Sequence, residues 1–128
     1  MDYHFSKTVP LDFQAAVEKV TAELKARGFG ILTQIDVRQT LKAKLDVDFR
    51  PYLILGACNP PFAYKALQAE DKIGTMLPCN VVVQQHADGK IEVSAVDPVA
   101  SMAAIENPAL AAIAEEVRGR LRQVVDAL

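Results

Sequence analysis

Residues 52–67, YLILGACNPPFAYKAL, hold the transition that decides the fold. The run from Tyr52 to Ala57 is apolar without interruption, which is typical of a strand buried on both faces. Asn59 then stands where a helix N-cap is favoured, and Pro60 stands at the first helical position, where no backbone N–H is needed. The stretch therefore predicts a buried strand that leads directly into a helix, with Cys58 at the junction.

The chain before this junction predicts two strands and two helices. Residues 3–9 alternate between polar and apolar positions as a strand does, and residues 29–35 read as a second strand. Between them, Asp12 is the expected N-cap of an amphipathic helix that ends at Gly28. Asp36 begins a capping-box pattern, which predicts a second, shorter helix before the junction.

The chain after the junction predicts a hairpin and a long helix. Residues 79–86, CNVVVQQH, carry three consecutive valines, which favours a strand covered on both faces. Asp88-Gly89 is the signal of a two-residue type I′ turn, and residues 90–97 alternate as the returning strand. Asn107-Pro108 repeats the Asn-cap, Pro-first device at the start of the last helix. The apolar stripe of that helix is Leu110, Ile113, Ala114, Val117, Leu121, Val124, Val125 and Leu128.

These elements predict one α+β domain over residues 1–128, with a mainly antiparallel sheet of about five strands and helices packed on it. A chain of 128 residues is long enough to bury a sizeable core. Hydrophobic residues make up 51% of it, slightly above the usual range of about 45–50%. This excess indicates a covered apolar face, such as the interface of a homodimer.

Residues 52–67, the segment MLPCNVVV at 76–83, and the hairpin from Asp88-Gly89 to Asp97-Pro98 resemble the domain of unknown function 302 family of bacteria and archaea. The most specific elements are Gly-Ala-Cys-Asn-Pro at 56–60 and Leu-Pro-Cys-Asn at 77–80. The resemblance covers nearly the whole chain. It implies a β-α-β(4)-α fold, similar in layout to TATA-binding-protein-like folds, and a homodimer, but it implies no activity.

Charge and terminal composition disfavour several classes of partner. The net charge is −2, and the basic residues are interspersed with acidic ones, so no nucleic-acid partner is expected. The chain lacks an apolar stretch of the roughly 20 residues that a membrane span needs, so no membrane partner is expected. The first eight residues, MDYHFSKT, lack a signal-peptide core, which predicts a cytoplasmic protein whose cysteines stay reduced.

Motifs for metals, nucleotides and hydrolysis are missing. Two cysteines and the two histidines, His4 and His86, are spread along the chain and form no zinc pattern, so neither a metal nor a cofactor is expected. Gly28-Phe29-Gly30 lacks the third glycine of a phosphate loop. The serines have no nucleophile-elbow signature.

Cys58 and Cys79 form the most interesting pair. If the strands that carry them are antiparallel neighbours, the end of one lies beside the start of the other and the two sulfurs can approach. If residues 58–78 form a parallel crossover, the cysteines lie about a strand length, ~20 Å, apart. Only the antiparallel arrangement permits a dithiol switch, sulfur handling or soft-metal binding, while packing is the simpler interpretation of either cysteine.

Asn59, Asn80 and Asp97 also fall at predicted strand ends, so the candidate binding site is a rim formed by Cys58, Asn59, Cys79, Asn80 and Asp97. The alternative for the three polar residues is structural, because Asn and Asp commonly cap helices and bond the backbone at turns.

Three functional hypotheses follow, and the sequence leaves open whether the chain is an enzyme. A module that binds a small ligand requires only a cavity near the rim, and is favoured. A thiol-dependent redox or sulfur-handling protein requires both Cys58 and Cys79 to be close and accessible. A structural homodimer without small-molecule chemistry requires neither.

Overall fold

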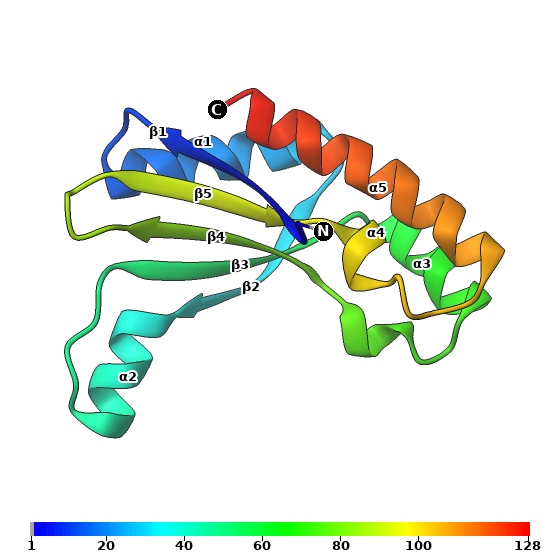
Figure 1. Ribbon diagram of the computed structural model, residues 1–128, viewed down its shortest axis with the longest axis horizontal. Coiled ribbons are helices and arrows are strands. Elements are labelled where there is room, and N and C mark those ends of the chain that lie inside the picture. The colour runs from blue at the N-terminus through cyan, green and yellow to red at the C-terminus, as the bar shows by residue number, and fades with distance from the viewer. Residues whose placement is uncertain (1) are drawn as a thin grey trace.

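The computed structural model describes residues 2–128. The strands are β1 (His4–Val9), β2 (Gly30–Asp36), β3 (Tyr52–Cys58), β4 (Cys79–Gln85) and β5 (Ile91–Val96). The helices are α1 (Phe13–Ala26), α2 (Val37–Leu45), α3 (Pro60–Ala69), α4 (Pro98–Ser101) and α5 (Pro108–Asp126), with a 3₁₀ turn, η1 (Ile73–Met76). The strands form one open sheet in the order β1–β5–β4–β3–β2, and every neighbouring pair is antiparallel (Figure 1).

The predicted fold class is confirmed. One strand, the helix α1, four further strands and the helix α5 follow one another in chain order, with α2 and α3 inserted between strands. This is the β-α-β(4)-α arrangement, and its sheet is antiparallel throughout the described residues.

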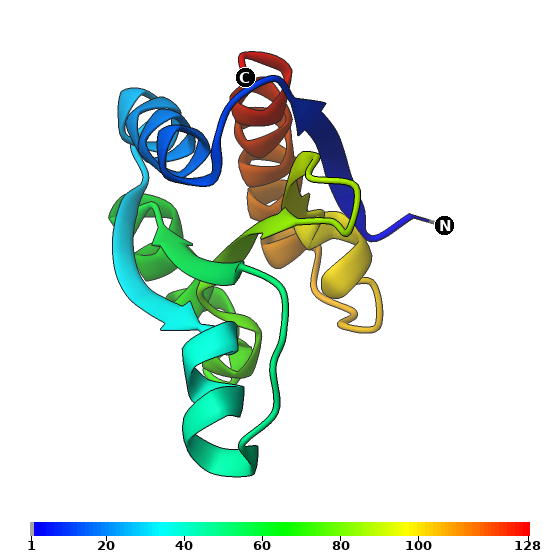
Figure 2. The same ribbon diagram turned by 90° about the vertical axis from the view of Figure 1, so that its left-hand side faces the viewer.

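The helices α1 and α5 lie on one face of the sheet (Figures 1 and 2). The helix α1 packs on β4 and β5, and α5 packs on β1 and β5. Apolar residues that alternate along the strands meet the stripes of both helices in the main core, which includes Leu24, Leu55, Val81, Val93 and Leu121. The opposite face of the sheet is left open, and α2 projects from the β2 edge on that side.

The junction after β3 forms as its sequence predicts. Asn59 is the N-cap of α3, with its Oδ1 accepting a hydrogen bond from Phe62 N at 3.2 Å, and Pro60 is the first helical residue. Leu53 and Leu55 are buried beneath the helices, whereas Ile54 is half-buried on the open face. Burial on both faces of this strand is thus incomplete, because no helix covers its second face.

Two local predictions differ from the structure. The hairpin between β4 and β5 is not a type I′ turn, since that turn needs positive φ at both central residues and only Gly89 has it, at 86°. Gly89 N donates to His86 O, and His86 N donates to Lys90 O, which makes a longer loop. In addition, Asp97 does not simply end the hairpin but caps the short helix α4.

The position of Leu121 provides a test of the packing. Its side chain is fully buried in the main core, so Leu121→Ala is expected to lower the free energy of unfolding by about 2–5 kcal/mol in denaturant titration. Gln123 is exposed on the same helix, and Gln123→Ala is expected to change it by less than about 0.5 kcal/mol. Equal effects of the two substitutions would contradict the assigned face of α5.

Candidate functional site

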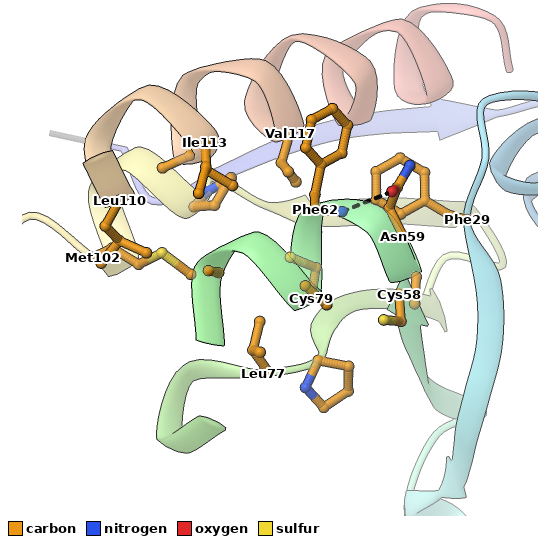
Figure 3. Close-up of a pocket in the computed structure, with 16 residues that line it drawn as sticks. Phe29, Cys58, Asn59, Phe62, Leu77, Cys79, Met102, Leu110, Ile113 and Val117 are labelled. Atoms are coloured by element: carbon orange, nitrogen blue, oxygen red, sulfur yellow. Dashed lines mark hydrogen bonds between the residues drawn. The ribbon is translucent and has the colours of Figure 1, made fainter. Parts of the chain in front are cut away.

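An apolar cavity lies where the end of β3 and the start of β4 meet α3, α4 and α5 (Figure 3). Its volume is about 40 Å³, and the empty space between its walls is about 440 Å³ when the mouth is included. A single water molecule needs roughly 10–15 Å³ by the first of these measures, so the enclosed part has room for a few water-sized groups, and a larger occupant would extend into the open mouth. The lining residues are Phe29, Ala57, Cys58, Asn59, Phe62, Ala63, Ala66, Leu77, Pro78, Cys79, Pro98, Met102, Leu110, Ile113, Ala114 and Val117.

The cavity lies between two separate hydrophobic clusters. The main core supplies Phe29, Ala57, Cys79 and Val117 to its walls. A second cluster, here called the helical cluster, supplies most of the opposite wall and consists of Ala66, Ile73, Met102, Leu110 and Ala114.

Small side chains create the space between the clusters. Ala57, Ala63, Ala66 and Ala114 line the cavity from three different elements. A larger side chain at any of these positions would occupy part of the volume. Protein interiors normally close such gaps, because each missing contact forfeits dispersion energy. A gap of this kind is uncommon, since a domain holds few voids larger than a water molecule.

The two cysteines both border this cavity. The strands β3 and β4 are antiparallel neighbours, with Ala57 opposite Cys79, so the condition under which the thiols can approach is met. Cys79 shares a face with Ala57 and is buried, whereas Cys58 follows Ala57 by one residue, ends the strand and is half-buried. Both are free thiols.

The environment of the cavity keeps both thiols neutral. Burial, and to a smaller extent the neighbouring Cys58, raise the pKa of Cys79 to about 11. Burial also raises the pKa of Cys58. The N-terminus of α3 lies next to Cys58 in the chain, and a helix N-terminus favours the thiolate and lowers its pKa. Desolvation of the thiols outweighs this effect and raises the pKa of both.

The side chain of Asn59 lies between the cavity and the end of α1. Its side chain is only 7% exposed and its Oδ1 is used by the cap, as the dashed line in Figure 3 shows. Its Nδ2 lies on the side of Gly28, where a Cβ at position 28 would stand 2.9 Å from it. Gly28 has a φ of 86°, so glycine serves here both the left-handed end of α1 and the approach of this amide.

Arg120 lies beside the same point. Its guanidinium stacks over the Phe62 ring, with 4.8 Å between the guanidinium carbon and the ring centroid. Its Nη1 donates to Arg27 O at 3.3 Å, and its Nε donates to Glu116 at 3.4 Å. The arginine is therefore held beside Phe62 and paired with Glu116, outside the residues that line the cavity.

Asp97 has a structural role next to the cavity. Its Oδ1 accepts from Val99 N and Ala100 N, and its Oδ2 accepts from Arg118 Nε at 3.1 Å. The carboxylate thus fastens the start of α4 to α5, and the next residue, Pro98, supplies part of the cavity wall.

Asn80 lies apart from the cavity. Successive strand residues face opposite ways, so Asn80 points to the open face of the sheet when Cys79 points to the helices. It borders a shallow depression there with Tyr52 and Ser94. The structure thus gathers Cys58, Asn59 and Cys79 around one cavity, with Asp97 behind its wall and Asn80 elsewhere.

Sequence reasoning missed most of the cavity wall. Ile113 and Val117 belong to the stripe of α5, Phe62 lies on α3, and Met102 follows α4. An apolar helical residue looks the same in the sequence whether it meets a neighbour or a void. Arg120 lies on α5 outside its apolar stripe. Its contact with Arg27 joins residues 93 positions apart, for which the sequence carries no local signal.

The described residues contain no cluster of three or more His, Cys, Asp or Glu side chains that is arranged to hold a metal ion. None of the helices within residues 2–128 combines the length and the apolar character that a membrane crossing requires.

Comparisons with known proteins agree with the fold. A crystal structure of an uncharacterized conserved DUF302 protein from Bacillus stearothermophilus has 31% sequence identity and a TM-score of 0.91, and the match covers 98% of each chain. No curated protein matches the chain. The profile of the family described as domain of unknown function DUF302 matches residues 5–128. The chain therefore belongs to the DUF302 family.

Proposed function

We propose that the chain binds a small, largely apolar molecule in the cavity between the main core and the helical cluster. The observation that carries the proposal is the position of the cavity, whose apolar walls are supplied by both buried clusters and by Ile113, which packs against each of them. Small-molecule sites are concave and mostly apolar, with few polar groups at their edges, and this cavity has that character. The residues at its strand ends, Cys58, Asn59 and Cys79, serve as binding residues in this proposal.

A cavity-filling substitution tests the binding. Ala114 is buried in the wall, so Ala114→Leu is expected to fill part of the space and abolish binding of toluene, a probe that matches the apolar lining. Toluene binding is measured by amide chemical-shift changes in NMR titration. Ala111 is exposed on the same helix, and Ala111→Leu is expected to bind toluene as the wild type does. Failure of the wild type to bind toluene, or unchanged binding by Ala114→Leu, would count against the proposal.

The thiol-dependent alternative, redox or sulfur handling by Cys58 and Cys79, ranks second. Thiol chemistry uses the thiolate, and the raised pKa of each cysteine leaves little thiolate at neutral pH. The environment resembles that of packed cysteines more than that of reactive ones. Both cysteines are free thiols, as expected in a reducing compartment such as the cytoplasm. The cytoplasmic location itself stays a prediction.

Alkylation separates the two interpretations. Iodoacetamide at pH 7 is expected to leave Cys79 unmodified in the native protein and to modify Cys58 more slowly than it modifies glutathione. Modification of Cys79 should rise as the pH approaches its pKa of about 11, or when the chain unfolds. Mass spectrometry of peptides locates each adduct. Modification of native Cys79 at pH 7 as fast as that of glutathione would restore the thiol hypothesis to first place.

We also propose that the chain forms a homodimer through β2 and α2, here called the β2–α2 arm. No residue of α2 is buried, and isolated helices shorter than about 12–15 residues are marginal in water. Leu32 and Leu45 are each 65% exposed, and β2 is an edge strand whose outer backbone groups have no partner strand. We therefore expect another protein surface to cover the exposed apolar side chains of the β2–α2 arm.

A second copy of the arm fits as that cover. The acidic N-cap Asp36 stands at one end of α2, and Lys42 and Lys44 stand in its last turn. A two-fold axis perpendicular to the two helices would make them antiparallel and bring Asp36 of each copy near Lys44 of the other, while Lys42 pairs with Asp46 and Asp48 of its own chain.

Leu45→Lys is therefore expected to convert a dimer to a monomer in sedimentation velocity, because it places a charge in the buried part of the contact. Tyr64 is equally exposed but lies on α3, away from the arm, and Tyr64→Lys is expected to remain dimeric. Circular dichroism verifies that both variants are folded. A monomeric wild type, or a dimeric Leu45→Lys protein, would remove the arm as the interface.

A further inference from the structure

The arginines of the chain divide into two groups according to their partners. The chain has six arginines, and four of them form ion pairs with a carboxylate. These pairs are Arg27 with Glu23, Arg118 with Asp97, Arg120 with Glu116, and Arg122 with Asp126. The other two, Arg38 and Arg50, pair with no carboxylate of residues 2–128.

Both unpaired arginines line one open depression, here called the arginine depression. Its volume is about 660 Å³, and its other lining residues are Pro51, Gln85, His86 and Ala87. Among residues 2–128, no acidic side chain lines it. It lies beside the start of β3 and the end of β4, where α2 begins and the β4–β5 loop turns, and so at the opposite ends of the two strands that border the cavity (Figure 1).

Arg50 is held in place although it has no counter-ion. Its guanidinium carbon lies 4.4 Å from the centroid of the Phe49 ring and 5.5 Å from that of the Tyr52 ring. Its Nε donates to Gln84 Oε1 at 2.9 Å, which leaves both Nη groups without a hydrogen bond in the described part of the chain. An arginine that is oriented in advance loses less conformational entropy when it binds an anion.

The acidic side chains near the arginine depression have other partners. Asp36 accepts a hydrogen bond from a backbone N–H at the start of α2, which it caps. Glu92 pairs with His86 Nε2 at 3.3 Å. Asp88 accepts a hydrogen bond from a backbone N–H of the β4–β5 loop. The positive charge of the depression is therefore that of its two arginines.

We infer that the arginine depression binds the phosphate group of a small molecule, with Arg38 and Arg50 as its two cationic contacts. Arginine forms paired hydrogen bonds with carboxylate and phosphate oxygens, and a phosphate monoester carries roughly 1.5 to 2 negative charges at pH 7. Two arginines match such a dianion, whereas a single carboxylate matches one arginine. The volume falls in the range of about 300–1,000 Å³ that is typical of small-molecule sites, so an ester fits as well as the free ion.

Titration with three anions tests this ligand class. Inorganic phosphate, phenyl phosphate and benzoate are each added to the wild-type protein at pH 8, where both phosphates are dianions, and binding is followed by calorimetry and by amide chemical shifts in NMR. Phenyl phosphate is expected to bind at least about fivefold more tightly than benzoate, with shifts at residues 37–39 and 85–89. Tighter binding of phenyl phosphate than of inorganic phosphate would assign the site to an ester, and equal affinities would assign it to the free ion.

Substitution of the arginines tests the contacts. Arg50→Gln and Arg38→Gln each remove one charge and are each expected to weaken phenyl phosphate binding at least about fivefold. Arg122→Gln is the matched control, because Arg122 is also an exposed arginine over an aromatic ring, 5.2 Å from the centroid of Phe5, but pairs with Asp126. It should bind phenyl phosphate as the wild type does.

Failure of the wild type to bind either phosphate, or an equal loss of binding in Arg50→Gln and Arg122→Gln, would overturn the inference. Loss of a dimer by Arg50→Gln in sedimentation velocity, with no phosphate binding by the wild type, would instead assign the arginines to a contact between copies. Toluene binding by Arg50→Gln is expected to equal that of the wild type, so the outcome at the arginine depression is separate from that at the cavity.

Discussion

The antiparallel pairing of β3 with β4 is the constraint on which the site depends. It sets Ala57 opposite Cys79 and thereby brings the end of one central strand beside the start of the next. Because β3 leads into α3 after a single capping residue, and β5 leads into α4 in the same way, both helices begin at this end of the sheet. The helix α5 then crosses above them, so the cavity lies where three helices, α3, α4 and α5, converge on one pair of strands.

Much of this arrangement was predictable because its signals are local. The step from an apolar run to Asn59 and Pro60 specifies a strand end, a cap and a first helical turn within a few residues. The stripe of α5, with Leu121 at its centre, specifies a buried face by spacing alone. The rim hypothesis placed Cys79 and Asn80 in one site. The alternation of side chains along a strand argues against this, because adjacent residues cannot share a face of a regular strand.

The remainder depends on contacts between distant residues. The ion pair that holds Asp97 to Arg118, and the bond from Arg120 to Arg27, arise only once α5 is seated. The same is true of the cavity, because a void is the absence of a neighbour and leaves no mark on a sequence. Turn geometry was mispredicted for a different reason: Asp88-Gly89 is compatible with several loops, and the hydrogen bonds of His86 select the longer one.

The division of the buried residues into two clusters also bears on how the molecule moves. The main core ties the sheet to α1 and to the C-terminal half of α5, whereas the helical cluster ties α3, η1 and α4 to the N-terminal half of α5. Ile113 packs against both clusters, and Phe62 of α3 packs against the main core, so side chains of α3 and α5 join the two clusters beside the cavity. Local opening is easiest where buried apolar contacts are fewest, so an occupant that touches both clusters is expected to slow amide hydrogen exchange in α3 and η1 more than in the strands.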